Sequence, residues 1–91
     1  MEHVKYDLGQ LTQGSTVVVS LDKQANVRLM TASNYRVYSA GRGGQFSSTG
    51  GLMKRSPTTL VVPSRDHWFL AIDLGGGSGS IRSSVSVNAQ R

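Results

Sequence analysis

The chain has 91 residues, a mass of 9.7 kDa and a formal net charge of +5. That length suits one small domain over residues 1–91, with a core over about residues 4–87, and leaves no room for a second. Because there is no cysteine, disulfides, thiolate zinc sites and cysteine nucleophiles are excluded. The N-terminus lacks the apolar segment of a signal peptide, and the longest apolar run, residues 68–72, is too short to span a bilayer. We therefore expect a cytoplasmic domain without membrane contact.

Short strands dominate the elements that the sequence predicts. Val, Ser, Thr and Gly are abundant. Three residue types that favour helices are scarce, with five Ala, three Lys and one Glu in the chain. Apolar and polar residues alternate in four runs, which predicts strands with one buried face and one face in water. These runs are residues 4–8, 16–21, 25–30 and 81–88.

Two further runs predict strands of a different kind. Residues 59–62 form a short run that Pro63 closes, because proline has no N–H for a strand ladder. Residues 67–74 are apolar on both faces, which predicts a central strand covered on both sides. The glycine-rich residues 75–79 are interpreted as a flexible hairpin loop.

The middle third of the chain has weaker signals. Ser33 and Asn34 can cap one helical turn, which we expect over about residues 33–38. Residues 45–49 make a poor strand between glycine-rich stretches. We therefore expect residues 31–57 to be a long excursion with little regular structure, a kind of segment that often carries binding.

Together these elements predict an all-β domain, a single antiparallel β-sandwich or jelly roll of about seven or eight short strands. Trp68 is the expected anchor of its core. The expected core is Val4, Tyr6, Val17, Val19, Leu21, Val27, Leu29, Leu60, Val62, Trp68, Leu70, Ile72, Ile81, Val85 and Val87.

Positive charge is concentrated in the middle of the chain. Residues 23–65 contain seven basic residues and no acid, whereas the remaining residues sum to −2. Aromatic residues lie among these cations, so the segment can be interpreted as a face for anions or nucleic acid, or as ordinary solubilising charge. The candidate binding residues are Arg28, Tyr35, Arg36, Tyr38, Arg42, Lys54 and Arg55.

The motifs of enzymes and cofactor sites are missing from the sequence. Residues 75–79 lack the Lys and the following helix of a phosphate-binding loop. His3 and His67 are the only histidines, and their spacing does not suggest a metal site. No Gly-x-Ser-x-Gly elbow supports a serine nucleophile. We expect no metal, no cofactor and no enzymatic activity.

A series of short segments follows in order along the chain: Tyr-Asp-Leu-Gly at 6–9, Val-Arg-Leu-Met at 27–30, Ser-Asn-Tyr at 33–35, Arg-Ser-Pro at 55–57, Val-Pro-Ser at 62–64, His-Trp at 67–68, Asp-Leu-Gly-Gly at 73–76 and Arg-Ser-Ser-Val at 82–85. Together these segments resemble a small bacterial family, the domain of unknown function numbered 1883. The resemblance implies a small all-β domain, found alone or beside a Toll/interleukin-receptor-type domain, with no assigned activity. A looser likeness to Golgi-dynamics-type jelly rolls is a fold-level analogy.

Two functions stay open from the sequence. The first is a non-enzymatic interaction module that contacts a protein partner or a second copy through an exposed edge strand or through residues 31–57. The alternative is an anion- or nucleic-acid-binding domain that uses the basic segment 23–65. Salt distinguishes them, because only polyanion binding collapses as the salt concentration rises.

Overall fold

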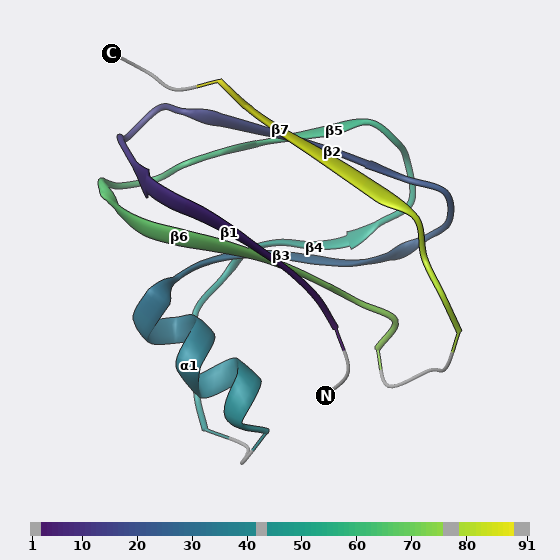
Figure 1. The fold of residues 1–91 in the computed structure, drawn as a ribbon, viewed down its shortest axis with the longest axis horizontal. Helices are drawn as coiled ribbons and strands as arrows, with labels where there is room; N and C mark the ends of the chain where they lie inside the picture. Colours follow the sequence, from purple (N-terminus) through teal and green to yellow (C-terminus); the bar gives the residue numbers. More distant parts are fainter. Residues whose placement is uncertain (1–2, 42–43, 76–78, 89–91) are drawn as a thin grey trace.

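The computed structural model describes residues 3–41, 44–75 and 79–88, and this part of the chain forms seven strands and one short helix (Figure 1). The strands are β1 (Val4–Leu11), β2 (Thr16–Leu21), β3 (Ala25–Thr31), β4 (Thr49–Met53), β5 (Thr58–Val61), β6 (Asp66–Asp73) and β7 (Ser83–Asn88). The helix α1 (Ala32–Ala40) follows β3 directly. The seven strands confirm the predicted fold class.

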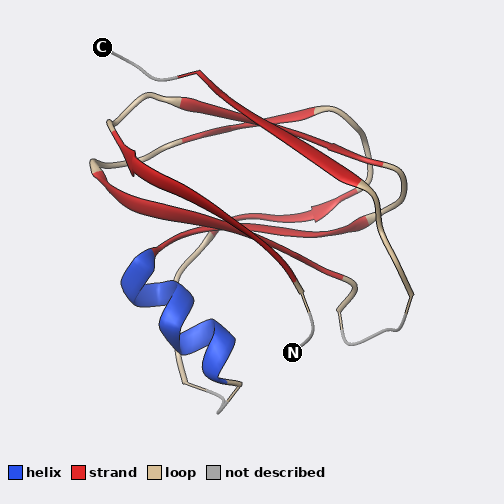
Figure 2. Cartoon of the chain, viewed as in Figure 1, coloured by secondary structure: helices blue, strands red, loops and turns tan. Residues whose placement is uncertain are grey.

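Two antiparallel sheets pack face to face as a sandwich. Sheet A has the strand order β1-β6-β3-β4, and sheet B has the order β5-β2-β7. The helix lies against the face of sheet A that points away from sheet B, as Figures 1 and 2 show. Sheet A is therefore packed on both faces, and β6 has a neighbouring strand on each side, as predicted for a central strand.

The main core lies between the two sheets. Trp68, Leu70 and Ile72 point into it from β6, and Val17 and Val19 meet them from β2. All of these side chains are buried, and the rest of the predicted core is buried or packed against it. The sequence did not identify Leu11, Ala25 and Met53, which are also buried here.

The prediction of an irregular segment over residues 31–57 is wrong. Thr31, rather than Ser33 or Asn34, caps the helix, and α1 runs to Ala40 before Gly41 ends it with a left-handed backbone. The strand β4 begins at Thr49, where the predicted poor strand ends.

The strand β4 is hard to recognise because its sequence is Thr-Gly-Gly-Leu-Met, which has little strand propensity. Gly50 is required by close packing: its φ is +114°, and a Cβ there would lie 2.5 Å from the carbonyl oxygen of Val27. The close approach of β3 therefore requires glycine at this position, and glycine is a residue that sequence patterns do not associate with strands.

A bulge in β1 explains why that strand is longer than its alternation predicts. The pairing of β1 with β6 shifts between Asp7 and Gly9, and this shift turns Leu11, instead of Gln10, toward the core. Gly9 has a φ of +73°, and its N–H donates to the Asp7 carboxylate at 3.0 Å.

The interpretation of residues 75–79 as a hairpin loop is also wrong. They belong to the connection between β6 and β7, and these strands lie in different sheets. The connection therefore crosses from one layer of the sandwich to the other; residues 76–78 within it lie outside the described residues. Within the described part of the chain, no helix has the length and apolar character needed to cross a membrane.

Candidate functional site

Four of the candidate binding residues lie on or near the outer face of sheet A. Arg28 is on β3 and Tyr38 is on α1, where the tyrosine is buried. Tyr35 is half-buried on the same helix, and Arg36 is exposed beside it. Burial of Tyr38 leaves its ring unavailable for stacking with a base.

The other candidates are elsewhere. Lys54 and Arg55 are exposed in the turn between β4 and β5, and Arg42 lies outside the described residues. Arg65, another cation of the middle segment, is in the turn before β6 at the opposite end of the sandwich from Lys54. The described cations of residues 23–65 are therefore spread over several surfaces rather than one.

A buried carboxylate, Asp73, joins the helix to sheet A. It is 2% exposed at the end of β6 and accepts hydrogen bonds from the Tyr38 hydroxyl at 2.7 Å and from Arg28 Nε at 3.1 Å. Asn26 Nδ2 donates at 3.1 Å and the Gly75 N–H at 2.9 Å. The bond to the Gly75 N–H, in the turn after β6, is thus only one part of a network that spans β3, β6, α1 and the loop.

The surroundings of Asp73 hold it ionised. Burial alone would raise its pKa, but the hydrogen bonds from Tyr38, Asn26 and the Gly75 N–H outweigh burial and lower the pKa below its usual range. Burial and the bond to this carboxylate raise the pKa of Tyr38 well above its usual value. A carboxylate with this many donors serves as a structural anchor, and its oxygens are committed to the fold.

Aromatic rings fill the space between α1 and sheet A. Phe69 on β6 stacks on Tyr35 with ring centroids 4.6 Å apart and on His67 at 5.1 Å. Tyr38 meets Phe46 edge-on at 5.2 Å. Met30 and Ala71 lie in the same cluster. These contacts attach the helix to the sheet, so the aromatic residues near the cations have a packing role.

An exposed histidine–carboxylate contact lies at the other end of this face. His67 Nε2 and Asp7 Oδ1 are 2.6 Å apart, and both side chains are substantially exposed. The hydrogen bond from His67, followed by that from the Gly9 N–H, lowers the pKa of Asp7. No third His or acidic side chain joins them in a metal-binding group within the described residues.

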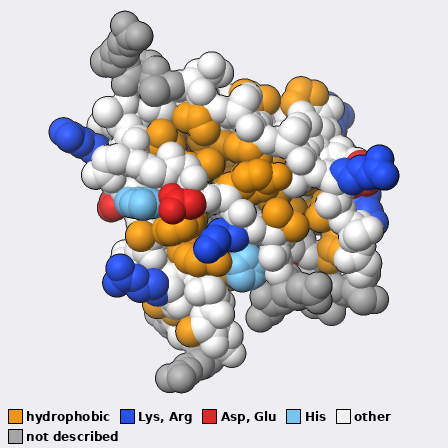
Figure 3. Space-filling view, viewed as in Figure 1, with side chains coloured by type: hydrophobic (Ala, Val, Ile, Leu, Met, Phe, Trp, Pro, Cys, Tyr) orange, Lys and Arg blue, Asp and Glu red, His pale blue; other side chains and the backbone are white. Residues whose placement is uncertain are grey.

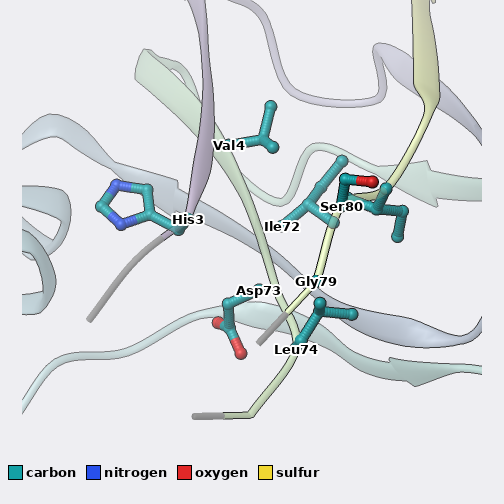
Figure 4. A pocket seen from close by; sticks show the side chains of 8 residues that line it. His3, Val4, Ile72, Asp73, Leu74, Gly79 and Ser80 are labelled. Carbon is teal, nitrogen blue, oxygen red and sulfur yellow. The ribbon is translucent and has the colours of Figure 1, made fainter. Parts of the chain in front are cut away.

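A pocket of about 250 Å³ opens beside the N-terminal end of β1, between β1, the end of β6 and residues 79–81. Figure 4 shows that the Asp73 carboxylate points away from Val4 and Ser80, which also line the pocket. The lining also includes Ile72 and Leu74. The pocket's carboxylate is held by its own network, and His3, which also lines the pocket, lies 2.9 Å through Nε2 from the Tyr35 hydroxyl.

Cations gather at one end of the sandwich. Lys23, Lys54 and Arg55 line a pocket of about 160 Å³ at the β2–β3 and β4–β5 turns. Arg82 is beside them, because its N–H donates to Asp22 at 2.9 Å. Figure 3 shows Lys and Arg side chains together with an acidic one at the right-hand end of the molecule. We call these four cations the basic end.

The cations of the basic end form no ion pair within the described residues. Among residues 3–41, 44–75 and 79–88, the ion pairs are Arg28 with Asp73 and His67 with Asp7. The cations of the basic end are therefore not neutralised by ion pairs in the described structure. With Asp22 counted, this end carries a formal +3 from four cations and one acid.

Each sheet ends in two edge strands, and three of the four carry features that disfavour strand addition. The strand β1 carries two charges, Lys5 and Asp7, and the bulge. The strand β4 has Gly50 and Gly51 at positive φ. The strand β5 has four residues and lies between two prolines.

The fourth edge strand, β7, is different. Its sequence, Ser-Ser-Val-Ser-Val-Asn, has no charge, no proline and no glycine, and its pairing with β2 is regular. Val85 and Val87 are only half-buried against the core. Figure 3 shows apolar side chains exposed in a band across the face where Figure 1 places β1 and β7 in front. In the described part of the chain no strand pairs with the outer edge of β7, where Tyr6 of β1 contacts Ser83.

The direction of the backbone groups in β7 follows from three hydrogen bonds. The Asp22 N–H donates to the Arg82 carbonyl, and the Arg82 N–H donates to the side-chain oxygen Asp22 Oδ1, so Arg82 bonds toward β2. On the other side, the Tyr6 hydroxyl donates to the Ser83 carbonyl at 3.3 Å. Because backbone groups alternate along a strand, Val85 and Val87 direct their N–H and C=O toward the open edge.

The sequence predicted β7 as a strand but did not identify it as the open edge. The signal that was available is the lack of charge over residues 83–88, which contrasts with the charged alternation of residues 4–8. Of the basic end, the sequence named Lys54 and Arg55 as candidates but not Lys23 and Arg82. These two are far apart in the sequence, and only the pairing of β2 with β7 brings them together.

These features define a small antiparallel β-sandwich domain in which β7 is an uncharged edge strand. The family model described as a domain of unknown function, DUF1883, matches residues 1–91. The chain belongs to this family, which confirms the resemblance seen in the short segments. No curated protein and no solved structure matches it.

Proposed function

We propose that this chain is a non-enzymatic interaction module of the bacterial cytoplasm, and that it binds protein by accepting a strand at the open edge of β7. The observation that carries the proposal is the contrast between β7 and the other three edge strands. An extended segment placed beside β7 gains backbone hydrogen bonds from Val85 and Val87 and meets their half-exposed side chains.

The lack of charge on this strand supports a protein partner rather than a polyanion. The outer face of sheet B continues the same character, with Ser, Thr, Val and Asn at every outward position of its three strands. Val61 is one of the few large apolar side chains that are strongly exposed, at 55%. A neutral surface of this kind gives phosphate groups no cation to bind.

Two substitutions on the same face provide a matched test. Ser86 and Thr59 are the register partners of Val18 from opposite sides, and both are exposed. Ser86→Lys places a charge on the β7 edge, whereas Thr59→Lys places the same charge on β5. Tagged wild-type and variant chains are incubated with cell extract, and the bound proteins are quantified by mass spectrometry.

We expect a protein that binds the wild type and Thr59→Lys and is reduced at least about tenfold with Ser86→Lys, a change of about 1.4 kcal/mol. Binding of that protein should also slow amide exchange in β7. Equal recovery with all three chains would contradict strand addition at this edge.

A second candidate function is binding of a nucleic-acid backbone at the basic end. The observation in its favour is the pocket shared by Lys23, Lys54 and Arg55, whose charges have no ion-pair partners in the described structure. Phosphate groups would replace water there, and binding would release counterions.

Fluorescence anisotropy with labelled single- and double-stranded oligonucleotides tests this candidate at about 50 and 200 mM salt. With about three phosphate contacts, affinity should fall roughly 40-fold over that range for the duplex and roughly 20-fold for the single strand. Arg55→Glu should abolish binding, whereas Arg36→Glu on α1 is the matched control. Equal effects of the two variants, or no binding at low salt, would exclude the basic end.

A further inference from the structure

We infer that the strand accepted by β7 is the β7 strand of a second copy, so that two sheets B join into one continuous antiparallel sheet. This inference rests on the proposed function, because it names the partner of the same edge. The joined sheet would have the order β5-β2-β7-β7-β2-β5, with a two-fold axis between the two central strands.

The pattern of β7 is complementary to itself in an antiparallel pair. Val85 and Val87 point inward, and Ser84, Ser86 and Asn88 point outward. Placing the axis at Ser86 sets Val85 opposite Val87 of the second copy, and every inward residue of this overlap then meets a valine. Outward residues meet only serine or asparagine, so no polar side chain is forced toward the core.

Hydrogen-bond directions select the same register. Val85 and Val87 direct their backbone groups outward, so two Val85–Val87 pairs would exchange about four backbone hydrogen bonds. Ser83 is not needed, which matters because Tyr6 already donates to its carbonyl and approaches its hydroxyl at 2.6 Å. An axis at Val85 would instead pair Ser83 with Val87 and would compete with Tyr6.

Charge favours the antiparallel orientation of the two copies over a parallel one. Each chain has a formal net charge of +5, so two copies repel unless their cations are kept apart. The seam itself has no charge between Ser83 and Asn88. Antiparallel pairing places the two basic ends at opposite ends of the seam, because Arg82 precedes the first residue of β7 in each copy.

Single cysteines provide a direct test, because the natural chain has none. Ser86 would face its own copy at a non-hydrogen-bonded position, where Cα atoms lie about 4.5 Å apart, within the range that a disulfide bridges. Ser84→Cys, Ser86→Cys and Asn88→Cys are oxidised mildly and resolved on a non-reducing gel. Thr59→Cys is the control, since it is exposed on the same face of sheet B.

We expect Ser86→Cys to give the highest yield of covalent dimer, several-fold above Thr59→Cys. The untreated wild type, measured by light scattering at about 10 µM to 1 mM, should rise from a mass near 9.7 kDa toward twice that value. Ser86→Lys should remain monomeric, and Thr59→Lys should behave as the wild type.

A monomeric wild type over this range, or a covalent dimer yield no higher for Ser86→Cys than for Thr59→Cys, would overturn self-pairing. A maximum at Ser84→Cys or Asn88→Cys would overturn the axis at Ser86. These results leave the proposed function standing if the extract experiment still yields a protein that depends on β7. Loss of that dependence as well would remove both proposals.

Discussion

Sheet A is packed on both faces, with the shared core on one side and α1 on the other, whereas sheet B is packed only on its inner face. The two sheets also differ in charge. The outer face of sheet A contains both ion pairs of the described residues and the buried Asp73. The outer face of sheet B contains no charged residue on its strands.

This difference shows which polar groups remain available to a partner. Arg28 and Tyr38 both donate hydrogen bonds to Asp73, and these bonds hold α1 on the sheet. In sheet B the backbone groups along the open edge of β7 have no strand beside them in the described structure. The proposed strand addition would use these backbone groups of β7 and would leave the Asp73 network intact.

The core that the two sheets share should be the most sensitive part of the molecule. Trp68 is 4% exposed, and its Nε1 donates to the Ser64 carbonyl at 2.9 Å. Trp68→Ala should cost about 3–5 kcal/mol in the free energy of unfolding, because it leaves a cavity between the two sheets. Urea unfolding followed by circular dichroism measures this loss, and both sheets should unfold in one transition.

Leu52→Ala is the matched control for a large apolar side chain outside the core. Leu52 is 52% exposed on β4, so its truncation should change the free energy of unfolding by no more than about 0.5 kcal/mol. If Trp68→Ala costs less than about 1 kcal/mol, the side chain is not the anchor of the core that the two sheets share.

The sequence predicts the fold well where alternation and burial agree. The runs at residues 16–21, 25–30 and 67–74 correspond to β2, β3 and β6 within one residue at each end. These strands have one face against the core or lie in the centre of a sheet, so the hydrophobic pattern follows directly from burial. The residues that the strands bury were predicted for the same reason.

Prediction fails where long-range contacts select the residue. Gly50 is present because Val27 approaches it, and Leu11 turns inward because of a bulge set by pairing with β6. The Asp73 network joins residues 45 or more positions apart in two of its bonds. A local sequence pattern does not indicate such contacts. For the same reason the candidate binding residues, which were chosen by their charge along the chain, lie on several different surfaces of the fold.

The Asp73 network should give the smaller effect, and one that depends on pH. Because its folded pKa lies below the unfolded value of about 3.9, the ionised carboxylate stabilises the fold above that pH, and the contribution is lost as the pH falls through the folded pKa. Asp73→Asn should cost about 1–3 kcal/mol at pH 7, because it weakens the bonds to Arg28 and Tyr38. At about pH 3 the difference from the wild type should shrink.

The location of this loss distinguishes the two sheets. Amide exchange in Asp73→Asn should rise in α1 and at the end of β6 and should stay near the wild-type rate in β2 and β7, because the network touches only sheet A. Asp7→Asn is the control, since Asp7 is an exposed carboxylate of the same sheet whose pKa is also lowered, and its effect should be smaller. Equal exchange changes in both sheets would mean that Asp73 stabilises the sandwich as a whole, and that α1 is not a separately anchored layer on sheet A.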